Sequence, residues 1–156
     1  AVIKDYAEET KQHEKQEQTG RKIVLIIPAR DSIDDLAAQI LMQSIPHEDF
    51  ECHQLNSLRL ATETLTVIEQ LKANIAVITS VYPGDLAHTI YLCKRIRARF
   101  PEIVIVAGRF GINDPQSVKN NANKLQAAGV NRVTNTLQET IIELEKLDLL
   151  DLSGAE

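Results

Sequence analysis

The fold is decided near the middle of the chain, at Ile75-Ala76-Val77-Ile78-Thr79-Ser80-Val81-Tyr82-Pro83-Gly84. Residues 75–79 form a mostly apolar run, which is typical of a strand covered on both faces of a parallel sheet. The stretch 80–84 predicts the loop that leaves this strand. The same pattern recurs where residues 103–107 are followed by Gly108-Arg109-Phe110-Gly111. In an open α/β sheet such loops lie side by side at the carboxyl ends of the strands, where ligands bind.

Apolar runs alternate with helical patterns on both sides of this stretch. Strands are expected at 23–27, 50–55, 75–79, 103–107 and 130–133, and helices at 32–45, 60–71, 83–100, 115–128 and from 136 onward. Asp114-Pro115 and the capping box at 136–139 predict helix starts, and Gly129 predicts a helix end. Five alternating strands and helices predict a flavodoxin-like three-layer α/β sandwich, with a five-stranded parallel sheet in the order 2-1-3-4-5.

Length and composition favour one globular domain. The chain has 156 residues, of which 44% are hydrophobic and 25% charged, and its net charge is −5. The negative charge argues against nonspecific nucleic-acid binding, because phosphate binding requires a basic surface. The sequence contains neither a membrane-spanning apolar run nor a secretory signal. We expect a polar linker or exposed helix at 1–21, the domain at 22–148 and an acidic tail at 149–156. Cys52 and Cys93 are expected to be reduced and partly buried.

The predicted loops at the sheet edge, together with the first turns of the helix expected from residue 83, supply the candidate ligand-binding residues. Arginine can supply charge to a phosphate or carboxylate, a hydroxyl or helix amide can hold a polar group, and glycine permits close approach. The candidates are Arg30, Asp31, Ser80, Tyr82, Gly84, His88, Gly108, Arg109 and Gly111. Several have a simpler structural interpretation: Asp31 and Ser80 as helix caps, the glycines as turn residues with positive φ, and His88 as a partly buried histidine.

No catalytic, metal or cofactor signature accompanies these loops. The four histidines are scattered, and no nucleophile and base stand at a recognisable spacing. Response-regulator receivers carry an acidic pair after strand 1, a phosphate-accepting aspartate after strand 3 and a lysine after strand 5. In this chain Ser80 stands where receivers have the phosphate-accepting aspartate, and no lysine follows the fifth predicted strand. Phosphotransfer is therefore not expected.

The densest basic run is Lys94-Arg95-Ile96-Arg97-Ala98-Arg99, at the end of the third predicted helix. Cations are favourable near a helix C-terminus, so a solvated face explains the run. The alternative is a contact with anionic lipid headgroups or with an acidic partner.

Three stretches together resemble a cobalamin-binding-like domain, namely residues 27–31, 82–88 and 91–101. We associate this version of the domain with the cytosolic end of bacterial permeases of the autoinducer-2 exporter type. The resemblance covers about residues 22–147. It implies a cytoplasmic module tethered to the inner membrane by an upstream transmembrane domain. True cobalamin-binding domains ligate cobalt through Asp-x-His-x-x-Gly after strand 1. Ile33 and Leu36 replace that histidine and glycine, so no cobalamin or other cofactor is expected.

We therefore expect a non-catalytic regulatory module that binds a small ligand or a partner at the carboxyl edge of its sheet. One alternative is an enzyme acting on a phosphorylated or nucleotide-like substrate. Another is a structural domain that forms a homodimer through the helix carrying Cys93.

Overall fold

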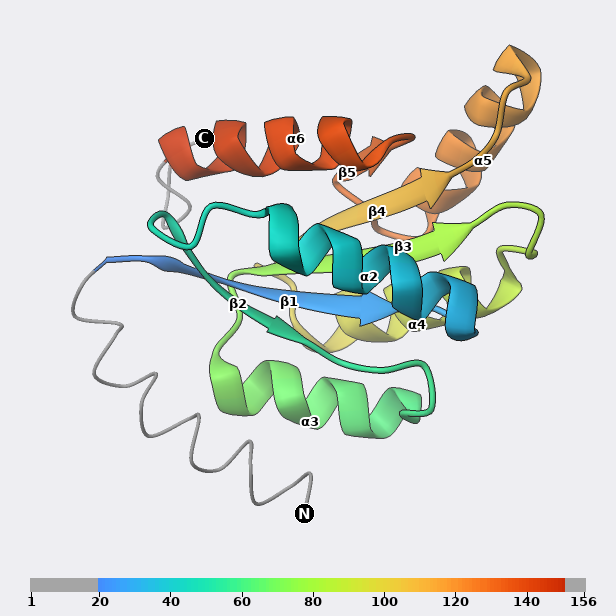
Figure 1. The fold of residues 1–156 in the computed structure, drawn as a ribbon. Coiled ribbons are helices and arrows are strands. Elements are labelled where there is room, and N and C mark those ends of the chain that lie inside the picture. The colour runs from blue at the N-terminus through green and yellow to red at the C-terminus, as the bar shows by residue number, and fades with distance from the viewer. Residues whose placement is uncertain (1–19, 151–156) are drawn as a thin grey trace.

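The computed structural model describes residues 20–150, and it contains one parallel sheet between two layers of helices (Figure 1). The predicted segments 1–19 and 151–156 lie outside the described residues. The strands are β1 (Lys22–Pro28), β2 (Phe50–Gln54), β3 (Ile75–Val81), β4 (Val104–Phe110) and β5 (Arg132–Thr134). The helices are α2 (Ser32–Ser44), α3 (Ala61–Leu71), α4 (Ala87–Arg99), α5 (Pro115–Ala127) and α6 (Leu137–Leu149).

The strand order is β2-β1-β3-β4-β5 with every pair parallel, which confirms the predicted flavodoxin-like topology. Helices α3, α4 and α5 pack on one face of the sheet and α2 and α6 on the other, so the core has two apolar layers. The central strands are buried on both faces, as their continuous apolar runs predict. In residues 20–150, no helix is long and apolar enough to cross a membrane.

Local signals placed most helix ends correctly. Asp31 caps α2, because its carboxylate accepts from the amides of Ile33 and Asp34. Asp114 caps α5 and Thr136 caps α6 in the same way, each through a side-chain oxygen. Gly129 follows α5 with a φ of +106°, the left-handed conformation that glycine tolerates best.

Strands β3 and β4 are longer than expected, and this corrects the prediction that loops begin at Ser80 and Gly108. Both residues belong to strands, and Ser80 pairs with Arg109 in the β3–β4 register. The expected helix from Pro83 is also wrong, since α4 begins at Ala87. The reason is that residues 80–81 stay in the ladder and the Gly84 carbonyl accepts a side-chain hydrogen bond from Arg109.

The helical spacing of apolar residues predicts buried faces in α2 and α6 that the structure corrects in part. In α2, Ile33, Leu36 and Ile40 are exposed, because the helix turns its alanines and Leu41 toward the sheet. In α6, apolar spacing predicts that Ile142 points inward, but Ile142 is exposed, whereas Leu147 is buried.

Candidate functional site

Arg109 is the centre of a closed cluster at the carboxyl ends of β3 and β4. Its side chain is buried, with 3% of the residue exposed, and its guanidinium has three partners. Nη1 donates to Ser80 Oγ at 2.9 Å, Nη2 to the Gly84 carbonyl at 2.5 Å and Nε to Asn121 Oδ1 at 2.9 Å. The Tyr82 ring lies 5.6 Å from the guanidinium carbon. Burial lowers the pKa of Arg109, and the Asp34 carboxylate opposes this shift.

Ser80 does not cap α4, which corrects one interpretation of this residue. Its hydroxyl accepts from Arg109, and it is buried. At the start of α4, Asp85 Oδ1 accepts from the Ala87 amide at 2.9 Å instead. The sequence could have indicated this role, because Asp85 lies two residues before the helix and aspartate favours such positions.

The two glycines of the second loop have different roles. Gly111 has a φ of +92°, as a turn residue of this kind requires. Gly108 lies in β4 without positive φ, and a Cβ there would come within 2.3 Å of the Phe110 ring. The ring occupies the space that a ligand would need to approach Gly108.

Asp34 closes the crevice between the ends of β1 and β3, the switch point of this topology. Its carboxylate accepts from the amide of Arg30 at 3.0 Å and from that of Val81 at 2.8 Å. Its carbonyl accepts from the Thr79 hydroxyl. Burial raises the pKa of Asp34, and the Val81 amide opposes the shift. Sequence reasoning did not identify this role of Asp34, because no local pattern shows a contact 47 residues away.

An open pocket of about 520 Å³ lies at the same edge of the sheet, next to the residues that Asp34 contacts. It is bounded by the loops after β1 and β2, the start of α3 and one side of α4. Of the nine predicted residues, Arg30 and His88 line it, and Arg59, Tyr91 and Arg95 join them. Sequence reasoning considered Arg95 only as part of the basic run 94–99 and assigned no role to Arg59 or Tyr91, although the loop after β2 also ends at this edge of the sheet. His88 is exposed, which corrects the partly buried interpretation, and its ring centre lies 6.3 Å from that of Tyr91.

Arg30 lies on the rim of this pocket. Its guanidinium donates to Asp85 Oδ2 and Asp31 Oδ2, each at 3.2 Å, and its side chain is 42% exposed. Gly84 separates Arg30 from the Arg109 cluster, since a Cβ on Gly84 would lie 3.3 Å from the Arg30 guanidinium carbon.

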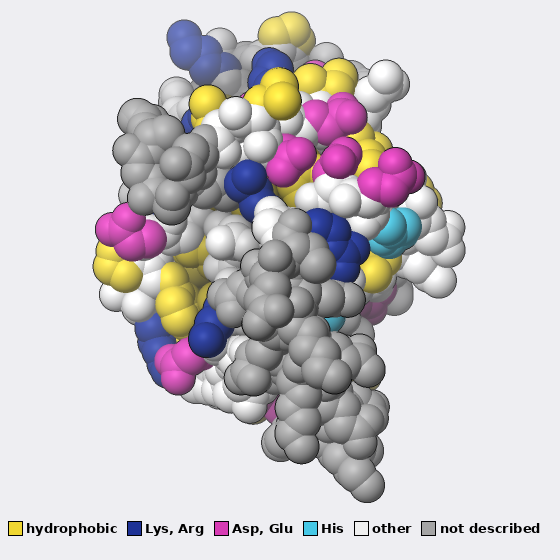
Figure 2. All heavy atoms as spheres, turned by 90° about the vertical axis from the view of Figure 1, so that its left-hand side faces the viewer, with side chains coloured by type: hydrophobic (Ala, Val, Ile, Leu, Met, Phe, Trp, Pro, Cys, Tyr) yellow, Lys and Arg dark blue, Asp and Glu magenta, His cyan; other side chains and the backbone are white. Residues whose placement is uncertain are grey.

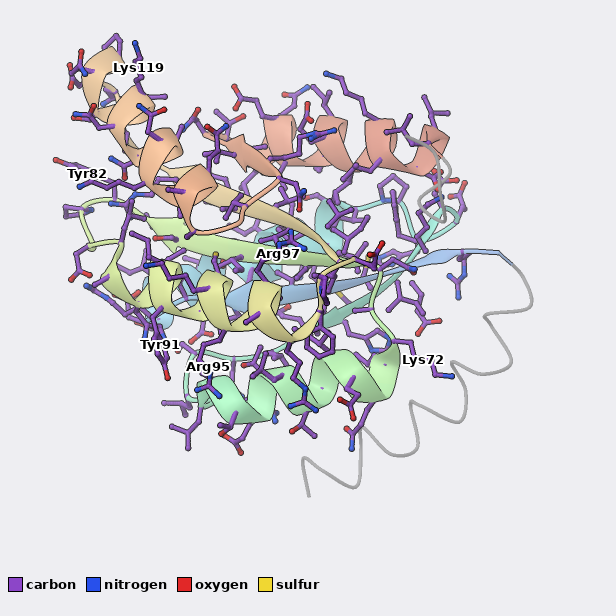
Figure 3. The ribbon with its side chains drawn as sticks, turned by 180° about the vertical axis from the view of Figure 1, so that it is seen from behind. Lys72, Tyr82, Tyr91, Arg95, Arg97 and Lys119 are labelled. Carbon is purple, nitrogen blue, oxygen red and sulfur yellow. The ribbon has the colours of Figure 1, made fainter. Side chains whose placement is uncertain are left out.

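The basic run of α4 divides between two sides of the helix, as Figure 3 shows for Arg95 and Arg97. Tyr91 and Arg95 point toward α3, and Arg95 Nη1 donates to the Tyr91 hydroxyl at 2.8 Å. Arg97 turns the other way and donates to the carbonyls of Phe100, Pro101, Ile103 and Gly129 and to Asn131 Oδ1. Arg99 pairs with Glu69. The run is therefore not one uniform solvated face.

The opposite end of the molecule, where the strands begin, carries acidic and basic side chains intermixed (Figure 2). A hollow of about 360 Å³ at this end is lined by residues 73–74 and 99–104. In the described part of the chain, no three histidine, cysteine or acidic side chains are arranged to hold a metal ion.

Comparison with solved structures defines the class of fold. A two-component response regulator of the LuxR family from Aurantimonas has a TM-score of 0.59 at 14% identity, covering 87% of this chain and 88% of its own. A Francisella response regulator receiver domain has a TM-score of 0.59 at 17% identity, with 82% and 97% covered. A cobalamin-binding protein from Desulfitobacterium hafniense has a TM-score of 0.56 at 12% identity, with 81% and 58% covered.

The chain thus has the flavodoxin-like fold that receiver domains and a cobalamin-binding protein share. No family model and no curated protein matches the sequence. The residues do not fit cobalt ligation of the kind described above, because Ile33 is a hydrocarbon side chain with no lone pair to donate.

Proposed function

We propose that this chain is a non-catalytic regulatory domain that receives its signal by binding a small ligand or a partner at the carboxyl edge of its sheet. The observation that carries this proposal is the contrast at that edge. The switch-point crevice is filled by the chain's own Asp34, and an open basic pocket lies beside it. The receiver-like fold supports a regulatory role, and the pocket supports binding.

The polar groups at the edge argue against phosphoryl transfer. The Asp31 carboxylate accepts from two amides of α2, and the Asp34 carboxylate accepts from the amides of Arg30 and Val81. The strand β3 ends in Thr79-Ser80-Val81, with no carboxylate to accept a phosphoryl group. The Ser80 hydroxyl faces a guanidinium, which cannot act as a general base for a nucleophile.

The test has two parts. The protein is incubated with acetyl phosphate and Mg²⁺ and examined by intact-mass spectrometry, with a phosphorylatable receiver domain as the positive control. We expect no phosphoryl adduct on this chain. Amide chemical shifts are then followed during titration with pooled metabolites and with the cytosolic proteins that co-purify with the full chain, and we expect changes concentrated around residues 30, 59 and 88. A stable adduct, or the absence of any shift at this edge, contradicts the proposal.

We further propose that the domain is cytoplasmic and belongs to a membrane transporter. The support is the motif resemblance over residues 27–31, 82–88 and 91–101. The genomic reading frame around this segment tests the proposal: several apolar spans of about 20 residues support it, and a frame without them contradicts it.

We also propose that the chain forms a homodimer and binds no cobalamin. Cys93 faces the core of the sheet layer and is fully buried, so a dimer would use the outer face of α4 rather than Cys93. Light scattering after size exclusion measures the oligomeric state. Incubation with hydroxocobalamin should leave the cobalamin absorption spectrum unchanged, and a spectral shift would show ligation.

A further inference from the structure

The open pocket concentrates positive charge on a protein that is negative overall. Arg30, Arg59 and Arg95 all line it, and none of the described residues lining it is acidic, whereas the whole chain has a net charge of −5. Its volume of about 520 Å³ is in the range typical of small-molecule sites. The charge of the lining therefore selects for an anion.

Arg95 is available to an anion. Its recorded contacts are with Tyr91, whose hydroxyl accepts at 2.8 Å and whose ring centre lies 5.6 Å from the guanidinium carbon. Within residues 20–150, no carboxylate pairs with it. A neutral phenol and a ring face orient the guanidinium and leave its charge uncompensated.

Arg30 is paired with two carboxylates, but its side chain remains partly exposed to solvent. Its two carboxylate partners are themselves 40% and 69% exposed on their side chains, so both ion pairs are in contact with solvent. Exposed pairs of this kind are weak, and a doubly charged anion in the pocket competes with Asp85 for the same guanidinium.

The start of α3 forms part of the same lining. Ala61 and Thr62 line the pocket, and the preceding residue, Leu60, has no side chain that accepts a hydrogen bond. First-turn amides have no acceptor within their own helix. Glu63 accepts from the Leu60 amide and is not among the lining residues.

We infer that this pocket binds the phosphate group of a phosphorylated molecule. This inference rests on the proposed function, because both place the ligand at the carboxyl edge of the sheet. Three arginines line this one cavity, and guanidinium groups are the donors that recognise phosphate bidentately. The exposed rings of His88 and Tyr91 border the same cavity and provide a surface for the organic part of the ligand. The phosphate can belong to a soluble metabolite or to a lipid headgroup.

The experiment separates these sources with defined probes. Isothermal titration calorimetry measures binding of inorganic pyrophosphate, ATP and adenosine, and co-sedimentation measures binding to phosphatidylglycerol and phosphatidylcholine vesicles. We expect pyrophosphate and ATP, or the phosphatidylglycerol vesicles, to bind, and adenosine and phosphatidylcholine not to bind. Affinity should fall as NaCl is raised.

Matched variants locate the site. Arg95→Gln should weaken binding by about tenfold, the loss expected for one charge-assisted hydrogen bond. Lys94→Gln removes the same charge from the adjacent exposed residue of α4, which lies outside this pocket, and should change affinity less than about twofold. Circular dichroism confirms that both variants remain folded.

The outcomes are distinguishable. Binding that Arg95→Gln and Lys94→Gln weaken equally shows a diffuse charge effect and overturns the inference. The absence of binding to every phosphate probe overturns it too, while the proposed function stands if the metabolite pool or a partner still shifts the amides of residues 30, 59 and 88. If no component shifts them, the proposed function fails as well.

Discussion

Two neighbouring regions at the carboxyl edge, separated by Gly84, use the same side chain in opposite ways. In the closed cluster, Arg109 is buried and each branch of its guanidinium has an acceptor from the chain itself. In the basic pocket, Arg30 and Arg95 border an open cavity. A buried charge is tolerated only when it is fully hydrogen-bonded, so the closed cluster must be satisfied internally. Arg30 and Arg95 are not fully buried and have no such constraint, so they can take an external anion.

A glycine and arginine motif therefore does not by itself mark a ligand site. The stretch 108–111 was a prominent sequence feature, yet its arginine fastens β3, β4 and α5 together. The pocket is assembled from residues in three separate segments that form no local motif.

The largest effect is expected from Arg109→Met. The change leaves Ser80, Asn121 and the Gly84 carbonyl without their donor, and it should lower the free energy of unfolding by about 3 kcal/mol. Urea denaturation measures it. Arg95→Met in the open region is the control and should change stability by less than about 0.5 kcal/mol. Equal losses in the two variants would remove the distinction between the regions.

Asp34→Asn should destabilise by about 2 kcal/mol, because an amide NH₂ placed against the Arg30 or Val81 amide cannot accept its hydrogen bond. Burial raises the pKa of Asp34 above its ordinary 3.8. The stability that this shift contributes is fully present below pH 3.8 and is lost as pH rises through the folded-state pKa. The loss in the free energy of unfolding caused by Asp34→Asn should therefore be larger at about pH 4 than at about pH 7.

Asp31→Asn is the matched control for that pH profile. The Asp34 amide donates to the Asp31 carboxylate and lowers its pKa, so its contribution is present above the ordinary value and is lost as pH falls. The loss in the free energy of unfolding caused by Asp31→Asn should be larger at about pH 7 than at about pH 4. Denaturation curves at the two pH values compare the variants, and the same pH trend in both would contradict the assignment of Asp34.

Ser80→Ala should lower stability by about 1 kcal/mol, since Arg109 loses one acceptor in a buried site. A double-mutant cycle with Arg109→Met should give a coupling energy of about 1 kcal/mol. A coupling energy near zero would show that the 2.9 Å contact contributes nothing to the closed cluster.

The smallest effect is expected in the open region. A cycle of Tyr91→Phe and Arg95→Gln should give a coupling energy of about 0.3 kcal/mol or less, because both side chains contact solvent. A value as large as that of Ser80 and Arg109 would mean that Arg95 is committed to Tyr91, and the phosphate inference would weaken with it.

Much of the architecture could be predicted because it depends on local signals. Continuous apolar runs marked the central strands, and Asp31, Asp114 and Thr136 marked three helix starts. Right-handed crossovers then left few topologies, so the order 2-1-3-4-5 followed. These signals act over a few residues, within the range in which side chains compete for backbone amides or alternate between faces.

The roles of the edge residues could not be predicted in this way. No local sequence signal distinguishes Arg109 from Arg95. The partners of Arg109 lie 12 to 29 residues away along the chain. Asp34 closes the switch point through an amide 47 residues away. Such contacts arise only when packing brings the strands together, since burial then forces each polar group either to find a partner or to remain at the surface. The amino-acid pattern was therefore sufficient to predict the fold. Packing determined which arginines are hydrogen-bonded inside the protein and which line an open pocket.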